Sequence, residues 1–354
     1  MMNRIEKIQK QLIENEVDAI LITKSENRRY ATGFTGSAGM VLVSKNSATF
    51  ITDFRYGEQA QDEVKHANTI IHDGNIEKEV ANEIERQGIQ IVAVEANAMT
   101  LKTFSSLQKY TNVQFIQLEN IIEKVREIKD EVELETMRTA ATIADKAFDN
   151  VLNMIKPGVT EIDIRDELEF FMRRQGASSS SFNIIVASGK RAALPHGVAS
   201  EKVIEHGDMV TLDFGALYRG YCSDITRTIA VGKCSDEFRN IYHTVLEALK
   251  RGTEAIRSGE KAKRIDDFTR DYITEKGYGQ RFGHSTGHGL GLEVHEPLRL
   301  SDKSEEVLKS GMVVTVEPGI YIPGWGGCRI EDDVVVTDKG YEIITHSTKD
   351  LLIL

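Results

Sequence analysis

Five side chains in the C-terminal half of this sequence have the chemistry of metal ligands. They are four carboxylates and one imidazole: Asp213, Asp224, His288, Glu317 and Glu331. An oxygen-rich set of this kind suits hard divalent ions such as Mn²⁺, whereas structural zinc sites use mainly cysteine and histidine. Four ionised carboxylates gathered in one place would repel each other, and some would take up protons unless cations balanced them. The set therefore predicts a centre of two divalent metal ions.

Two of these acids end short β-branched segments. Residues 209–213 read Met-Val-Thr-Leu-Asp and residues 313–317 read Val-Val-Thr-Val-Glu, and a turn residue follows each within two positions. Runs of this kind are typical of buried strands. A second acid follows each segment, Asp224 in the first case and Glu331 in the second. We therefore predict two strand–turn–strand units that each present two acids.

A repeated pair of glycines lies upstream of each unit. Gly158 precedes an amphipathic stretch that ends at Gly176, and Gly259 precedes one that ends at Gly277. We interpret the C-terminal half as an internal duplication.

Four histidines near these motifs are further candidates for a functional role. His284, His288 and His295 fall in one glycine-rich segment, and its glycines favour a loop or strand over a helix. Three histidines so close together favour a functional role over a structural one. His196, between Pro195 and Gly197, fits either role equally well when taken alone.

The elements that must position these residues fall into two parts that divide near residues 119–130. Before this point, the patterns predict a compact α/β domain. Its expected elements are an amphipathic helix over 5–13, a strand over 19–23, a hairpin of strands 40–43 and 49–52, and a strand over 91–94. Beyond it, Asp130 is expected to cap a long helix that ends near residue 155, before Pro157. Residues 178–181 are expected to form a turn before a strand over 183–187.

Composition excludes several classes of protein. The net charge of −11 argues against a nucleic-acid or anionic-membrane surface, and no apolar run reaches the length of a membrane span. The N-terminus has no apolar signal core, so a cytoplasmic location is expected. The three cysteines show no metal-binding spacing and argue against a disulfide framework. For Cys222 and Cys328, packing in a sheet is favoured over metal ligation.

These residues together resemble a known family. The segment from His284 to Glu296 is similar to the signature of the proline peptidases in the methionine aminopeptidase/creatinase superfamily, and the five ligands match that superfamily's ligands in order. Asp-Phe-Gly at 213–215, Val-Glu-Pro-Gly at 316–319 and Arg-Ile-Glu-Asp at 329–332 match as blocks. Tyr30 to Ser37 and Thr52 to Tyr56 resemble the small N-terminal domain of Xaa-Pro peptidases. The resemblance implies an α+β chain with a creatinase-like α/β domain over residues 1–124 and a pita-bread catalytic domain over 125–354.

The resemblance also implies roles at matching positions. Asp213 would bind one ion, His288 and Glu317 the other, and Asp224 and Glu331 both. The ions, most simply Mn²⁺, with Co²⁺ or Zn²⁺ as further candidates, would activate a water that attacks the peptide bond. His196, His284 and His295 would surround the ions, with His196 and His295 contacting the substrate. Arg329 would hold a substrate carboxylate or, equally, pair with a ligand acid. A homodimer is also implied.

Within the proline peptidases, two activities are considered, that of an Xaa-Pro aminopeptidase and that of an Xaa-Pro dipeptidase. A dipeptidase needs a wall or a cationic group that meets the proline carboxylate, whereas an aminopeptidase leaves that side open. The segment from Pro323 to Gly327 is short, and this favours the aminopeptidase. Trp325 would line the cleft or pack in a surface turn.

Three less favoured functions share the same fold. A methionine aminopeptidase would use the same five ligands, but it normally lacks an N-terminal domain of this size. A creatinase-like amidinohydrolase has both domains and does not use the metals. A non-catalytic peptide-binding module would usually have lost ligands, so the intact ligand set argues against both of the last two.

Overall fold

The structure is a computed structural model that describes residues 2–354. The chain forms two compact units, one that ends at Arg126 and one that comprises Glu127–Leu354. Each has its own hydrophobic interior and is described separately below.

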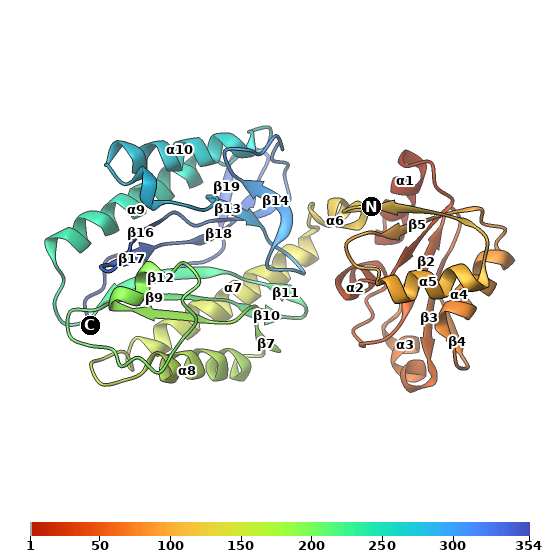
Figure 1. Cartoon of the computed structure of the whole chain (residues 1–354), viewed down its shortest axis with the longest axis horizontal. Coiled ribbons are helices and arrows are strands. Elements are labelled where there is room, and N and C mark those ends of the chain that lie inside the picture. Colours follow the sequence, from red (N-terminus) through yellow and green to blue (C-terminus); the bar gives the residue numbers. More distant parts are fainter. Residues whose placement is uncertain (1) are drawn as a thin grey trace. The chain divides into compact units, whose positions relative to one another are not determined.

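The N-terminal unit is built on one six-stranded mixed sheet, in the order β4-β3-β2-β1-β5-β6 (Figure 1). The antiparallel pairs are β1–β2 and β2–β3, and the other neighbours run parallel. The strands are β1 Ala19–Ile22, β2 Met40–Ser44, β3 Ala48–Asp53, β4 Asn68–His72, β5 Ile91–Glu95 and β6 Gln114–Leu118. The helices are α1 Arg4–Glu14, α2 Ser25–Thr32, α3 Gly57–Glu63, α4 Ile76–Arg86, α5 Leu101–Tyr110 and α6 Ile121–Arg126. The predicted α/β class, the first helix and the hairpin are confirmed.

The C-terminal unit places two helix pairs on opposite sides of its strands (Figure 1). The helices are α7 Glu131–Val151, α8 Glu161–Arg174, α9 Asp236–Glu254 and α10 Ala262–Glu275. The first-half strands are β7 Ser179–Ser180, β8 Ile185–Ser188, β9 Met209–Phe214, β10 Ala216–Tyr218, β11 Tyr221–Cys222 and β12 Ile225–Ala230. Those of the second half are β13 Gly287–Gly289, β14 Glu296–Leu300, β15 Val313–Val316, β16 Gly319–Ile322, β17 Gly326–Arg329, β18 Asp332–Val336 and β19 Tyr341–Ile343.

The predicted duplication is confirmed by the order and pairing of these elements. Each half contains two helices and, after them, a strand that pairs antiparallel with a later strand, β9 with β12 and β15 with β18. A short hairpin separates the two partners in each half. The equivalent glycines Gly158 and Gly259 have similar left-handed φ values, +97° and +90°, which L-residues rarely adopt.

Three local predictions need correction. Asp130 caps the helix as expected, and the helix ends at Val151 rather than near residue 155, because the chain turns before it reaches Pro157. Ser179 and Ser180 form a short strand against β10 rather than a turn, since pairing with a distant segment overrides the local preference of serine. The next strand starts at Ile185 rather than 183.

The two helix pairs cover separate cores. One core lies between α7, α8 and the sheet β12-β9-β8, and the other between α9, α10 and the sheet β14-β13-β15-β18-β19. The acids of the sequence motifs sit where these two sheets meet.

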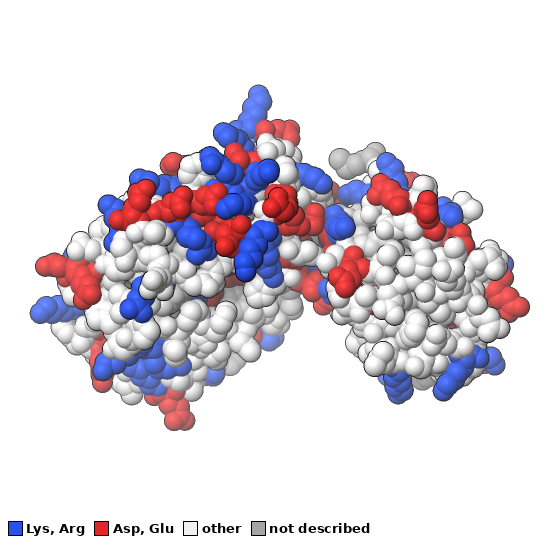
Figure 2. All heavy atoms as spheres, turned by 45° about the horizontal axis from the view of Figure 1, so that its top comes forward, with Lys and Arg blue, Asp and Glu red and all other residues white. Residues whose placement is uncertain are grey.

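The surface carries charged side chains of both signs. Acidic and basic side chains are interspersed on the face drawn in Figure 2. Pairs such as Arg251–Glu247 and Lys263–Asp267 place opposite charges one helical turn apart. Within residues 2–354, no helix is both long and apolar enough to cross a membrane.

Candidate active site

Strand ends from both halves place the four acids at one point. Asp213 is the penultimate residue of β9, and Asp224 directly precedes β12. Glu317 directly follows β15, and Glu331 directly precedes β18. Because the two halves repeat the same strand order, each one delivers two carboxylates to the seam between the sheets.

His288 approaches from β13, which is the predicted extended conformation. The glycine before it, Gly287, is required by close packing, since a Cβ there would lie 1.9 Å from the carbonyl oxygen of Thr315. This close approach is to the neighbouring strand β15 rather than to a ligand. His288 Nδ1 lies 3.1 Å from its acceptor, the carbonyl oxygen of Gly289, which leaves Nε2 facing the acids.

The distances describe a compact cluster. Asp224, His288 and Glu331 each offer a ligand atom, and these atoms lie within 4.8 Å of one another. His288 Nε2 lies 3.6 Å from Asp224 Oδ2 and 3.5 Å from Glu317 Oε1. All five predicted ligands line one cavity of about 530 Å³, together with His196, His284, His295 and Arg329. The structure therefore brings every predicted site residue to one place.

Burial and crowding change the pKa values of several side chains in the cluster. Loss of solvent, reinforced by neighbouring carboxylates, raises the pKa of Asp224 and of Glu317 well above the ordinary value and that of Glu331 to about 8. Burial also lowers the pKa of His288 to about 3 and that of His284 to about 4. An imidazole that stays neutral is able to donate a lone pair to a metal. Without cations, Asp224, Glu317 and Glu331 thus resist ionisation beside a neutral imidazole.

Two carboxylate oxygens show that the cluster suits cations. Asp213 Oδ1 and Asp224 Oδ1 are buried and accept no hydrogen bond from any residue that the structure describes. Buried acceptors without a partner are costly, and a divalent cation would satisfy both. The donor set, rich in oxygen with one nitrogen, fits the same ions.

The other histidines differ in their surroundings. The ring of His284 is held on both sides, with Nδ1 2.8 Å from the carbonyl oxygen of Ser285 and Nε2 2.9 Å from the hydroxyl of Tyr321. His295 is exposed, and its ring centroid lies 4.4 Å from that of His288. His196 is also exposed and lies in the loop after β8. His196 and His295 are thus more open to an incoming molecule than His284.

Arg329 is buried against the acids. Its guanidinium contacts Asp213 and donates to Tyr321 Oη at 2.8 Å and to Thr226 Oγ1 at 3.1 Å. These contacts are those of a cation that offsets the charge of the acidic cluster, which was one of its two predicted roles.

Sequence reasoning missed Arg299. This residue on β14 lines the cavity and stands opposite His288 in the β13–β14 ladder. Among the described residues, no carboxylate lies within ion-pair distance of its guanidinium. The alternation of strand side chains was the available signal, because Arg299 lies two positions beyond Pro297 on the half-buried side of β14, and His295 directly precedes this strand.

The cysteines and Trp325 lie outside this chemistry. Cys222 and Cys328 are both buried, and Cys328 belongs to the second-half core, so the packing interpretation holds. Trp325 packs against the same core and is not a lining residue of the cavity, which confirms that it packs in a turn.

Both units of the chain match known protein families. Residues 135–338 match the model of metallopeptidase family M24, and residues 4–128 match the creatinase/prolidase N-terminal domain. The chain belongs to metallopeptidase family M24. The predicted family, the two-part fold with a pita-bread catalytic unit and the assignment as a hydrolase are therefore confirmed. Membership in this family also implies that divalent metal ions serve the reaction.

Individual members of the family are similar over their whole length. The chain is 41% identical to the Xaa-Pro dipeptidase of Pyrococcus furiosus, with 99% of this chain and 100% of the relative covered. The structure of an Xaa-Pro dipeptidase from Bacillus anthracis is 55% identical, with a TM-score of 0.98 and 99% of both chains covered. An X-Pro aminopeptidase from Thermotoga maritima is 39% identical, with a TM-score of 0.91, 98% of this chain and 100% of that chain covered.

Proposed function

We propose that this member of the family is an Xaa-Pro dipeptidase. The observation that carries the proposal is Arg299, a cation in the cavity wall that no described carboxylate neutralises within ion-pair distance. A dipeptide with C-terminal proline carries a carboxylate close to the scissile bond, and a guanidinium binds a carboxylate with two parallel hydrogen bonds. Longer peptides have no charge at that position. The relatives named Xaa-Pro dipeptidase support the same choice.

This proposal replaces the aminopeptidase favoured by loop length. That inference assumed that the short segment from Pro323 to Gly327 borders the cleft. The segment forms the turn of the β16–β17 hairpin and the first two residues of β17, and none of its residues lines the cavity. Its length therefore carries no information about how long a peptide the site accepts.

We assign the metal ligands as the family resemblance implies, with two divalent ions per chain. Mn²⁺ fits the oxygen-rich set best, and Co²⁺ or Zn²⁺ are further candidates. The assigned ligands are Asp213 for one ion, His288 and Glu317 for the other, and Asp224 and Glu331 shared by both. When bound, such ions lower the pKa of water and polarise the scissile carbonyl.

Histidine and arginine side chains around the proposed ions have the remaining roles. The exposed His295 lies beside His288 and contacts the reacting peptide from the open side of the cavity, and His196 contacts it from the loop after β8. His284 acts from further back, because Tyr321 and Ser285 hold its ring. Arg329 balances the charge of Asp213 rather than binding substrate.

The preference for proline is supported by apolar side chains that line the same cavity. They belong to Phe182, Ile185, Pro195, Val198 and Val294. The Xaa-Pro bond has no N–H to donate, so an apolar surface beside it leaves no donor unsatisfied. The pyrrolidine ring gains by burial on the same surface.

Product analysis tests the proposal directly. The protein is reconstituted with Mn²⁺ and given Ala-Pro, Ala-Pro-Ala and Met-Ala-Ser together. Cleavage of Ala-Pro alone is expected. Release of alanine from Ala-Pro-Ala at a comparable rate would overturn the dipeptidase in favour of the aminopeptidase, and methionine release would move the assignment to a methionine aminopeptidase. The homodimer and the cytoplasmic location stay predictions.

A further inference from the structure

The two sheets that carry the assigned ligands meet without strand pairing among the described residues. β12 belongs to the sheet with β9 and β8, and β18 to the sheet with β15 and β19. Yet Asp224 directly precedes β12 and Glu331 directly precedes β18, and both must hold the same two ions. A backbone hydrogen bond crosses the seam from Glu331 N to Thr226 O at 3.1 Å. Side chains must supply the rest of the link.

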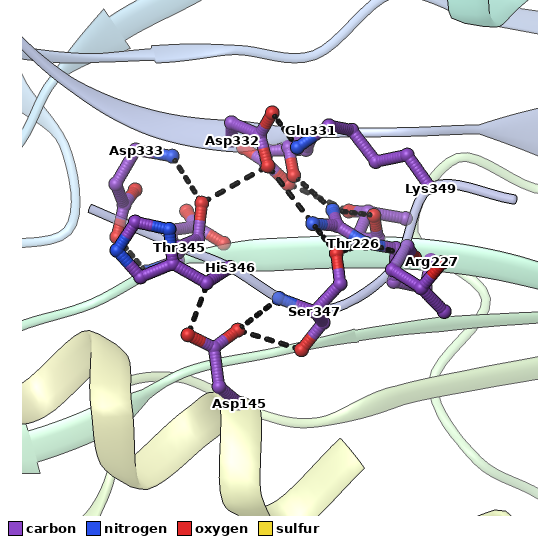
Figure 3. A network of polar contacts seen from close by, with 12 residues as sticks. Asp145, Thr226, Arg227, Glu331, Asp332, Asp333, Thr345, His346, Ser347 and Lys349 are labelled. Atoms are coloured by element: carbon purple, nitrogen blue, oxygen red, sulfur yellow. Dashed lines mark hydrogen bonds and ion pairs between the residues drawn. The ribbon is translucent and has the colours of Figure 1, made fainter. Parts of the chain in front are cut away.

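Arg227 crosses this seam from β12 (Figure 3). The residue is 1% exposed, and its Nη1 donates to the carbonyl oxygen of Glu331 while its Nη2 donates to Asp332 Oδ1 at 2.9 Å. A guanidinium is planar and rigid, so these bonds fix where the backbone of Glu331 lies relative to β12. A lysine at this position would have neither the fork nor the number of donors.

Asp333 crosses the seam in the opposite direction. Its Oδ2 accepts a 2.9 Å hydrogen bond from the backbone N–H of Asp224. The main chain of each shared ligand is therefore held by a side chain from the other half of the unit, Glu331 by Arg227 and Asp224 by Asp333.

The chain segment 345–349 lies next to Arg227 and holds it in place (Figure 3). Arg227 Nη2 donates to the carbonyl oxygen of Ser347 at 2.8 Å, and Nε donates to that of Thr348 at 3.1 Å. Lys349 pairs with Asp332 at 2.9 Å. The carbonyl oxygens satisfy donors that would otherwise be buried without partners, so the segment determines the orientation of the guanidinium.

Asp145 of α7 anchors this segment at its other side. Its Oδ2 accepts from His346 N at 2.8 Å, and its Oδ1 accepts from Ser347 N at 2.7 Å and from Ser347 Oγ at 2.6 Å. A continuous chain of contacts thus runs from the helix α7 through segment 345–349 to Arg227 and the seam.

We propose that Arg227 is a positioning residue for the metal centre and that segment 345–349, anchored by Asp145, holds it in register. The proposal rests on the ligand assignment made under the proposed function. Loss of the guanidinium fork would let the two strands shift, so that Asp224 and Glu331 no longer suit the same ions. Removing outer partners of metal ligands typically weakens metal binding by about 10- to 100-fold, and we expect this range for Arg227→Lys.

The test compares Arg227→Lys with Arg138→Lys. Arg138 of α7 also joins the two halves, through bonds to Glu342 at 2.8 and 2.9 Å, but it contacts none of the residues that touch the ligands. Mn²⁺ is titrated calorimetrically into each metal-free protein, and the thermal midpoint is recorded in parallel. A merely structural role would lower the midpoint and leave Mn²⁺ affinity unchanged. We expect weaker Mn²⁺ binding in Arg227→Lys and wild-type affinity in Arg138→Lys.

If Arg227→Lys does not fold, a second variant tests the same proposal. Asp145→Ala releases the segment from α7 at a half-buried position, and weakened Mn²⁺ binding in this variant supports the same proposal. Wild-type Mn²⁺ affinity in the folded variant, or an equal loss in Arg138→Lys, would overturn it. Failure of the wild-type protein to bind Mn²⁺ would overturn the proposed centre itself, and the inference with it.

Discussion

Thr226 Oγ1 donates a 2.6 Å hydrogen bond to Glu331 Oε2, although the two residues lie 105 positions apart in the sequence. The hydroxyl comes from β12 in the first half of the C-terminal unit, and the carboxylate comes from the second half. Thr226 Oγ1 also accepts a hydrogen bond from Arg329 Nε. One small side chain therefore contacts both a proposed shared ligand and the arginine that pairs with Asp213.

Replacing a shared carboxylate by its amide should abolish turnover without unfolding the protein. In Glu331→Gln or Asp224→Asn, each proposed ion loses a charged ligand. Replacing a residue that only contacts a metal ligand typically lowers activity by up to about 100-fold, so we expect kcat/KM to fall by more than this. The metal-free protein should keep its thermal midpoint, because a crowded buried acid has been removed. Glu247→Gln on the surface of α9 is the matched control. Near wild-type activity with a full metal complement would contradict the two-metal proposal.

Removing the Arg299 guanidinium should affect dipeptides selectively. A hydrogen-bonded contact to a charged group contributes about 1.5–3 kcal/mol, so Arg299→Ala should raise KM for Ala-Pro by about 10- to 100-fold. Ala-Pro amide has no C-terminal charge and should be hydrolysed almost equally by both proteins. Steady-state kinetics on the two substrates measure the effect, with Arg299→Lys expected to be intermediate. Equal losses on both substrates would show that Arg299 does not meet the carboxylate.

His295→Ala should lower kcat far more than it weakens metal binding. The side chain is exposed beside His288 and is not one of the assigned ligands, so its contribution is expected in the transition state. Parallel Mn²⁺ titration and kinetics separate the two effects, and His243→Ala on α9 provides a histidine control away from the cavity. Unchanged kcat with equal metal content would rule out a role for His295.

The metal-free protein should lose stability as the pH rises from about 6.5 to about 8. In this range the carboxyl of Glu331, with its pKa raised to about 8, still holds a proton in the folded state, whereas the unfolded chain has lost it. The unfolded state then binds fewer protons, and the free energy of unfolding falls with pH, by about 2 kcal/mol for one such group. Below this range His284 and His288 act in the opposite direction, because only their unfolded forms are protonated.

Urea unfolding in the presence of a chelator measures this slope. Glu331→Gln should flatten it, since an amide does not titrate. A wild-type free energy of unfolding that stays level or rises over the same range would contradict the expected protonation of the cluster.

Much of the fold could be predicted because its signals are local. The β-branched runs that end at Asp213 and Glu317 identified buried strands, and Asp130 identified the start of α7 as a residue type that caps helices. The repeated glycine spacing identified the duplication. The errors arose where a distant partner decided the outcome, as at Ser179 and Ser180, whose pairing with β10 no local pattern contains.

The sequence by itself determined the identity and order of the five proposed ligands and, through contiguous blocks around them, the family. Only the tertiary structure decided which charged groups meet. It turned Arg329 toward Asp213, left Arg299 in the cavity wall, and joined the two halves through Arg227 rather than through a strand ladder. The physical reason is that local periodicity specifies which side of an element is buried, whereas the partner of a buried charge lies a hundred or more residues away and is selected only when the two sheets pack together.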